Sequence, residues 1–150
     1  KEPSIAADVA QAIRAVGRER TVIVSSGNGA AIAEFRAASE GQVATGAALG
    51  EALGLYFDYL FGFEVDPELP FDALQVPSFS LVGIDLSTPE FIAFAQSHGL
   101  LIHFWTVDER AEMDRLIAAG ADGIMTTRPA LLQTAIQEYT PNAANVPDAP

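Results

Sequence analysis

Stretches of apolar residues of strand length alternate along this chain with stretches that repeat their apolar positions every three to four residues, as a helix does. The clearest example is the segment 100–129. An apolar run over 101–105 predicts a strand, the residues that follow predict a helix, and 122–126 predict a second, short strand. Pro129 suits the first turn of a further helix. A strand–helix–strand order of this kind predicts parallel strands joined by a right-handed crossover.

The central helix of this segment has recognisable ends. Asp108 is predicted as its N-cap, because a carboxylate can accept the free N–H groups of a first turn. Met113, Leu116 and Ile117 form one apolar face, and Gly120 stands where a glycine commonly terminates a helix.

The same alternation extends upstream. Ser4 is predicted as the N-cap of a first helix with Ile5, Val9, Ala12, Ile13 and Val16 on one stripe, and residues 61–71 are predicted as a loop. Further strands are predicted at 21–25, 42–46 and 73–77, and further helices after Gly29, at about 48–60, after Thr88 and around 131–136.

About five strands alternating with about six helices indicate an α/β fold with a parallel sheet. An open parallel sheet would suit the 150 residues, whereas a complete TIM (β/α)8 barrel takes roughly 200 to 250. We assign residues 1–139 to one domain. Residues 140–150, rich in Pro, Ala and Asn, are predicted to be a disordered tail.

The composition and net charge limit the classes of partner that the chain is expected to bind. The net charge of −12 disfavours nucleic acid and anionic membranes, and an anionic substrate would need a metal ion or a lysine as compensation. No apolar run is long enough to span a membrane, so no transmembrane segment is expected. There is no cysteine and no visible signal peptide. The compartment stays open, with the cytoplasm slightly favoured and secretion an alternative.

The segment from His103 to Pro129 resembles the last two βα units of the glycerophosphodiester phosphodiesterase family. The matching residues are Trp-Thr-Val-Asp at 105–108 and Gly-Ala-Asp-Gly-Ile-Met-Thr at 120–126, before Pro129. Thr127 departs from the pattern, which usually has Asp there. Upstream, Lys1 resembles the end of a Glu-x-Lys motif and residues 21–26 resemble the next strand, although Gly27 replaces a usual Phe.

This resemblance implies the C-terminal five or six βα units of a TIM barrel. The implied reaction is metal-dependent hydrolysis of a glycerophosphodiester to glycerol 3-phosphate and an alcohol. The family's catalytic histidines and its ligands for Mg²⁺ or Ca²⁺ lie upstream of the lysine, so neither catalytic nor metal-binding residues are expected in this chain. His98 and His103 match neither histidine. We therefore expect a companion N-terminal segment of about 100 residues to complete the barrel.

Three residues are candidate substrate contacts. Trp105 ends a strand, where barrel active sites lie, and is interpreted as an aromatic wall of the pocket, with a core aromatic as the alternative. Lys1 is either a cation that contacts phosphate or the ragged start of the chain. Gln75 could donate to a substrate oxygen, but a polar residue at a strand mouth is the more ordinary interpretation. His103 is predicted to be a packed core histidine.

Other functions stay open. The runner-up enzyme is a related phosphodiesterase of the same barrel type, such as a phospholipase-D-like sphingomyelinase. The non-enzymatic alternatives are a catalytically inactive scaffold and an α/β binding module. The aromatic residues between Tyr56 and Phe71 are predicted to be the packing face of a barrel helix, with a hydrophobic lid or a lipid-contacting surface as the alternative.

Overall fold

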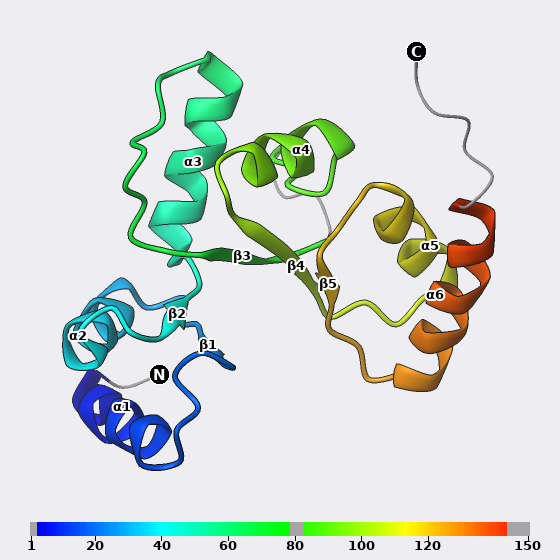
Figure 1. Ribbon diagram of the computed structural model, residues 1–150. Helices are drawn as coiled ribbons and strands as arrows, with labels where there is room; N and C mark the ends of the chain where they lie inside the picture. The colour runs from blue at the N-terminus through cyan, green and yellow to red at the C-terminus, as the bar shows by residue number, and fades with distance from the viewer. Residues whose placement is uncertain (1–2, 79–82, 144–150) are drawn as a thin grey trace. The chain divides into compact units, whose positions relative to one another are not determined.

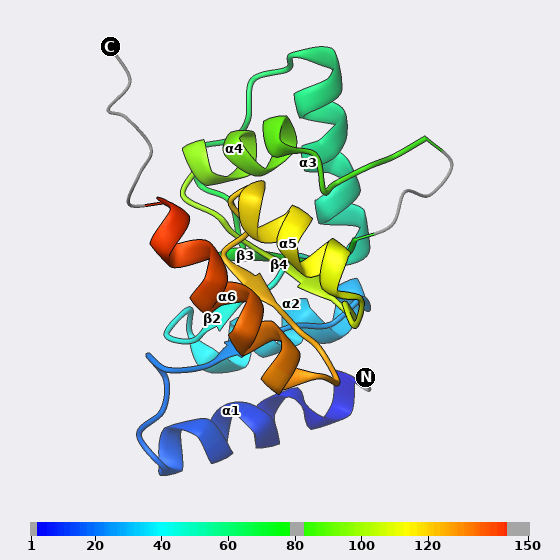
Figure 2. The same ribbon diagram turned by 90° about the vertical axis from the view of Figure 1, so that its right-hand side faces the viewer.

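The computed structural model describes residues 3–78 and 83–143, in which short strands alternate with helices (Figure 1). These residues divide into two compact units. The first contains the described residues up to Gln75 together with Ser97–Leu100. The second contains the described parts of Val76–Gln96 and Leu101–Pro150. The alternation of strand and helix predicted from the sequence is therefore present in both units (Figure 2).

In the first unit, two parallel strands are each followed by a helix. Strands β1 and β2 pair in parallel, with Ile23 opposite Ala44 and Val24 opposite Thr45. A parallel bridge from Gly46 to Ala73 continues the order toward the next strand. The elements are η1 (Pro3–Ile5), α1 (Ala6–Ala15), β1 (Ile23–Val24), α2 (Gly29–Ser39), β2 (Ala44–Thr45) and α3 (Leu49–Phe61).

The first turns of α2 and α1 differ in how their backbone N–H groups are capped. Asn28 caps α2, because its Oδ1 accepts the N–H groups of Ala30 at 3.0 Å and Ala31 at 3.4 Å. Ser4 does not cap α1. A 3-10 turn precedes this helix and Ile5 takes the N-cap position without a side-chain hydrogen bond, so the prediction for Ser4 was wrong.

The core of the first unit is formed where α1 and α2 pack together. The predicted stripe of α1 is only partly correct, because Val9 and Ile13 pack against the core whereas Ile5 and Val16 are exposed. The two residues of α1 that are fully buried are alanines, which allow a close approach of α2. The buried cluster comprises Ala6, Ala10, Ile32, Phe35, Val43 and Ala48.

The predicted packing face of α3 is only partly correct. The periodicity predicts Leu49, Leu53, Tyr56 and Leu60 on one side, and Tyr56 is buried, but Leu49 and Leu60 are 64% and 55% exposed. Ala52 and Leu55 are the other buried residues of this helix. The reason is that α3 is apolar on nearly all sides, so its periodicity cannot specify which side is packed.

In the second unit, β4 and β5 pair in parallel, with His103 opposite Gly123 and Phe104 opposite Ile124. Strands β3 and β4 have the predicted bounds, whereas β1, β2 and β5 are shorter than predicted because the ladder of backbone hydrogen bonds covers only two residues of each. The elements are β3 (Ala73–Pro77), at the boundary of the units, α4 (Pro89–Ser97), β4 (Leu101–Trp105), α5 (Arg110–Ala118), β5 (Gly123–Ile124) and α6 (Pro129–Ala143).

Side chains tie these elements together. The Thr88 hydroxyl accepts the Phe91 N–H at 3.2 Å at the start of α4. The Asp122 carboxylate accepts the Ile102 N–H at 2.9 Å and so holds β4 against the beginning of β5. This agrees with a conformational role for Asp122. The fully buried residues of these elements include Phe91, Ile92, Ile102, Phe104, Met113 and Leu116.

Helix α6 continues to Ala143, past the boundary that we predicted at residue 139. That boundary was placed where a segment rich in Pro, Ala and Asn begins, and its first proline, Pro141, lacks the N–H that a helix interior uses. The last turn nevertheless keeps a helical path through this proline. The remainder of the predicted tail lies outside the described residues. Over the described ranges, no helix is long and apolar enough to cross a membrane.

Candidate functional site

Strand β4 has one buried face and one open face. Ile102 and Phe104 are fully buried, whereas Leu101 and Trp105 on the other face are 43% and 44% exposed. Because side chains alternate along a strand, His103 shares the open face and is partly buried. Trp105 therefore lies at the carboxyl end of β4 with close to half of its surface available for contact.

The register of the two strands brings a second apolar side chain to this edge. His103 is paired with Gly123 and Phe104 with Ile124, so Trp105 is level with Met125. Backbone hydrogen bonds continue there, from the Met125 N–H to the Phe104 carbonyl at 2.8 Å. Met125 is 38% exposed. The carboxyl edge of β4 and β5 thus presents an indole and a thioether.

The ring of His103 lies over Gly123. A Cβ placed on Gly123 would come within 2.7 Å of the His103 Cδ2 atom, closer than carbon atoms approach. The glycine therefore leaves room for the imidazole on the open face of the sheet. This close packing supports a structural role for His103.

A cluster of hydrogen bonds joins the loop after β4 to the loop after β5. The Asp108 carboxylate accepts the Thr126 hydroxyl, the Thr127 N–H and the Thr127 hydroxyl, each at 2.8 Å. The Arg128 guanidinium donates to the Asp108 carbonyl at 3.2 Å. These four residues form what we call the Asp108 cluster. Since both loops follow the carboxyl ends of parallel strands, the cluster lies at the edge that also holds Trp105.

Asp108 takes part in this cluster instead of capping the helix that follows it. Glu109 occupies the N-cap position of α5 without a side-chain hydrogen bond, so the prediction of an Asp108 cap was wrong. The hydrogen bonds from Thr126 and then Thr127, with the charge of Arg128, lower the pKa of the Asp108 carboxyl. Asp108 is thereby kept ionised, as an acceptor that orders two loops.

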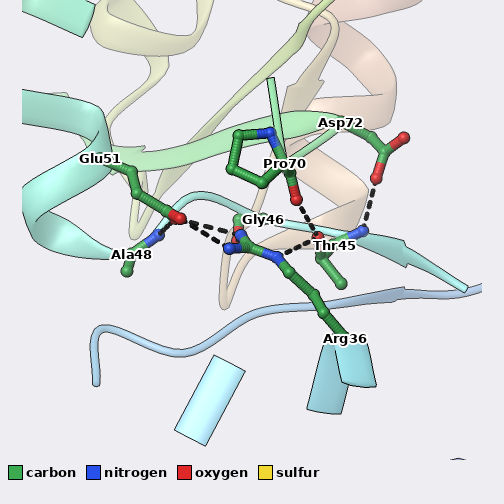
Figure 3. A network of polar contacts seen from close by, with 7 residues as sticks. All are labelled: Arg36, Thr45, Gly46, Ala48, Glu51, Pro70 and Asp72. Carbon is green, nitrogen blue, oxygen red and sulfur yellow. Dashed lines mark hydrogen bonds and ion pairs between the residues drawn. The ribbon is translucent and has the colours of Figure 1, made fainter. Parts of the chain in front are cut away.

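The first unit contains a separate polar network, centred on Arg36 of α2 (Figure 3). Its guanidinium donates to the Glu51 carboxylate at 2.6 and 3.0 Å, to the Thr45 hydroxyl at 3.0 Å and to the Gly46 carbonyl at 3.2 Å. Glu51 also accepts the Ala48 N–H at 2.6 Å, at the start of α3. One side chain thus connects α2, β2 and α3.

Asp72 extends this network, because its carboxylate accepts the Thr45 N–H at 2.7 Å. Burial disfavours the ionised Glu51, but the hydrogen bonds from Arg36 and from the Ala48 N–H, with the charge of Arg36, outweigh it and lower the pKa of the carboxyl. Every strong donor is matched by an acceptor within the network. It is therefore suited to holding the unit together rather than to binding a ligand.

A shallow cavity of about 710 Å³ lies at the opposite, amino-terminal ends of β1 and β2. It is lined by Gly17, Glu19, Arg20, Gly41 and Gln42, which belong to the turns that lead into these strands. Active sites of parallel α/β folds lie at the carboxyl ends, so this cavity is on the wrong side for catalysis.

The predicted substrate contacts fall in different parts of the chain. Lys1 lies outside the described residues. Gln75 is partly buried on β3 in the first unit, and Trp105 is on β4 in the second. Within residues 3–78 and 83–143, no group of three or more His, Cys, Asp or Glu side chains could hold a metal ion.

Comparison with known proteins agrees with the order of strands and helices. Residues 2–131 match the glycerophosphoryl diester phosphodiesterase family. The chain belongs to this family. The match covers most of the chain and confirms the resemblance found at residues 103–129.

Two curated relatives match shorter regions. A glycerophosphodiester phosphodiesterase of Caldanaerobacter subterraneus is 36% identical over 61 residues, which is 40% of this chain and 25% of that protein. A protein of Mycobacterium tuberculosis named "Probable glycerophosphodiester phosphodiesterase 2" is 39% identical over 62 residues, 41% of this chain and 23% of its own length.

Solved structures of the family identify the fold. The glycerophosphodiester phosphodiesterase of Parabacteroides distasonis superimposes with a TM-score of 0.67 at 22% identity, over 93% of this chain and 55% of the other. The α/β chain with parallel strands is thus part of a TIM barrel, as predicted, and the alternative of an independent open sheet is set aside. The chain spans about half the length of this relative.

Sequence reasoning missed the Asp108 cluster. Its members are separated by 18 and 19 residues, so no local pattern connects them. A signal existed in the order of the elements, because polar residues that follow two adjacent parallel strands meet at one edge of the sheet.

Proposed function

We propose that this chain supplies the C-terminal portion of a metal-dependent hydrolase that cleaves glycerophosphodiesters into glycerol 3-phosphate and an alcohol. The observation that carries the proposal is the family match over residues 2–131, which includes the half-exposed Trp105 at the carboxyl end of β4. That end of a parallel strand is where barrel enzymes bind their substrates.

The proposal assigns the acid, the base and the metal ligands to a companion N-terminal segment of the same barrel. Two observations support this assignment. The chain covers 55% of a solved relative, which leaves room for further βα units. The face of β4 that carries Leu101 and Trp105 is open, whereas the strands of a closed barrel are covered on both faces.

The residues of this chain would bind and orient the substrate. The Trp105 indole, with Met125 beside it in the register, offers an apolar wall to the glycerol or alcohol group. The Lys1 ammonium would contact the phosphate, since a protein with a net charge of −12 needs local positive charge to hold an anion. The Gln75 amide would donate to a substrate oxygen.

The bound cation, Mg²⁺ or Ca²⁺, would polarise the phosphate and stabilise the charge that develops during hydrolysis. No described residue of this chain is assigned as its ligand. The contribution of the chain is therefore geometric, through the strand edge that positions Trp105.

The proposal is tested with the protein as its gene encodes it, assayed on glycerophosphocholine. We expect hydrolysis that EDTA abolishes and that Mg²⁺ or Ca²⁺ restores. Trp105→Ala is expected to lower kcat/KM by about tenfold, because it removes one aromatic contact with the substrate. Tyr139→Ala, which removes an aromatic side chain that is 41% exposed on α6, serves as the matched control.

The other outcomes are equally informative. Activity that EDTA leaves unchanged would contradict the role of the metal. Hydrolysis of sphingomyelin with no turnover of glycerophosphocholine would favour the related lipid phosphodiesterase. A gene that encodes neither the catalytic histidines nor the metal-binding carboxylates of the family upstream of residue 1 would favour an inactive scaffold.

A further inference from the structure

Two groups of large apolar side chains can be distinguished in α3 and the segment after it. Tyr56 and Phe71 are buried, with 8% and 5% of their surface exposed. Phe57, Leu60, Phe61 and Phe63, which we call the α3 patch, are between 43% and 62% exposed. The packing face predicted from the sequence therefore accounts for the first group only.

The side chains of the α3 patch form a continuous row. The rings of Phe57 and Phe61 stack with their centroids 6.2 Å apart, and those of Phe61 and Phe63 are 5.7 Å apart. Leu60 is on the same turn of the helix as Phe57 and Phe61. Large apolar groups that gather on a surface in this way are characteristic of contact sites.

Within its own unit, the α3 patch lies away from the carboxyl ends of the strands. A helix that follows a parallel strand runs back toward the amino-terminal end of the sheet. Helix α3 follows β2 (Figure 1). Phe61 is the last residue of this helix. The α3 patch is thus on the opposite side from the carboxyl ends of β1 and β2. Barrel enzymes bind substrates at the carboxyl ends of their strands, so substrate binding does not explain the patch.

The charges around the patch have one sign. Asp58, Glu64, Asp66 and Glu68 occur within or just after α3, and the sequence contains no Lys or Arg between Arg36 and Arg110. An anionic lipid surface would be repelled by these carboxylates. A second copy of the chain would bring the same carboxylates face to face, which is also unfavourable.

We propose that the α3 patch binds a segment of a partner protein whose apolar side chains are flanked by Lys or Arg. Such a segment would bury the aromatic row. Its cations would pair with the carboxylates of Asp58, Glu64, Asp66 and Glu68, which form the acidic rim of the patch. Both attractions are required, since the rings supply contact area and the acidic rim supplies selectivity.

The probe for this proposal is a fluorescently labelled synthetic amphipathic helix of Leu and Lys, measured by anisotropy. Two further peptides separate the contributions: one in which Glu replaces Lys, and one in which Gln replaces Leu. We expect the Leu/Lys peptide to bind, added salt to weaken it, and both other peptides to bind at least about tenfold more weakly.

Variants locate the site. Phe61→Ser with Phe63→Ser is expected to weaken binding of the Leu/Lys peptide by about tenfold or more, because two exposed rings are lost. Val16→Ser removes an apolar residue that is 68% exposed at the end of α1, outside the patch, and is expected to leave binding unchanged. Circular dichroism of each variant verifies that it is folded.

Four results would overturn the proposal. Unchanged binding in the variant with Phe61→Ser and Phe63→Ser would mean that the peptide recognises only the net charge, and an equal loss in Val16→Ser would mean that the loss is not specific to the patch. Binding to phosphatidylcholine vesicles, with or without phosphatidylserine, in the absence of peptide binding would identify a membrane surface. Sedimentation as a dimer that Phe61→Ser abolishes would identify a second copy as the occupant.

Discussion

Asp108 and Thr127 are joined by two hydrogen bonds of 2.8 Å, one from the threonine hydroxyl and one from its backbone N–H. Asp108 follows β4 and Thr127 follows β5, so these bonds connect the loops at the carboxyl ends of two adjacent strands. Thr127 is also the position at which the chain departs from the usual family pattern. An Asp at 127 could not donate a side-chain hydrogen bond to Asp108 when both are ionised.

We predict that Asp108→Ala separates these two loops. The N–H and hydroxyl groups of Thr127 would lose their acceptor, and the strand end that bears Trp105 would become more mobile. The measurement is intrinsic fluorescence, since Trp105 is the only tryptophan in the chain. We expect emission at longer wavelength, stronger quenching by acrylamide and a lower midpoint of urea unfolding.

Two threonine variants control this experiment. Thr127→Ala removes a donor of the Asp108 cluster and is expected to change the fluorescence in the same direction as Asp108→Ala. Thr134→Ala removes a hydroxyl that donates to the Ala130 carbonyl within α6, away from the cluster. An equal response to Thr134→Ala would refute a specific role of the cluster.

The network around Arg36 leads to a prediction about stability. Arg36→Met keeps much of the aliphatic stem but removes the guanidinium that donates to Glu51, to the Thr45 hydroxyl and to the Gly46 carbonyl. Because hydrogen bonds to charged groups are individually strong, we expect a loss of about 2 kcal/mol in the free energy of unfolding, measured in urea. Arg14→Met, at an exposed position of α1, is expected to change it by less than about 0.5 kcal/mol.

The lowered pKa of Glu51 predicts how stability depends on pH. The unfolded chain has its glutamate pKa near the ordinary value of 4.5, above that of the folded state. As the pH falls, the unfolded state therefore binds the proton first. The stabilisation from Glu51 is complete above pH 4.5 and is lost as the pH falls through the folded pKa.

The test compares urea unfolding of the natural chain and of Glu51→Gln across this range. The difference in stability between them is expected to be largest near neutral pH and to decrease in acid. Other carboxylates with lowered pKa, such as Asp108 and Glu112, contribute equally to both proteins and cancel. A difference that is constant with pH would show that Glu51 titrates as an ordinary carboxyl.

The sequence predicted features that depend on neighbouring residues and missed features that depend on residues far apart in the chain. Strands β3 and β4 were predicted with correct bounds, because their apolar runs end at a proline or follow a glycine. Thr88 and Gly120 were identified correctly, since capping involves neighbours in the sequence. Asp108 was misassigned because two threonines far along the chain compete for its carboxylate.

The candidate site was only partly predictable for the same reason. Trp105 could be placed at a strand end from its position in an apolar run. Its exposure depends on how the alternation of β4 is oriented, and its neighbour Met125 depends on the register with β5. Neither the orientation of β4 nor its register with β5 can be derived from the local sequence. In α3, a helix apolar on nearly all sides, the buried face was undetermined until packing selected Ala52 and Leu55.

The contact between His103 and Gly123 leads to a final prediction. Gly123→Ala places a methyl group 2.7 Å from the His103 Cδ2 atom, so the imidazole or the strand must shift. We expect a loss of about 1–3 kcal/mol in the free energy of unfolding, as for other overpacked sites.

The matched control is Gly50→Ala on α3, where no atom lies within 4 Å of the added Cβ. At a helical position this change is expected to stabilise the protein by up to about 1 kcal/mol. The double variant Gly123→Ala with His103→Ala separates the two possible causes. If steric conflict with the ring is responsible, Gly123→Ala costs less stability in the His103→Ala background than in the natural chain. An equal cost in both backgrounds would place the conflict in the backbone of the parallel pair instead, and would remove the evidence that Gly123 makes room for the histidine.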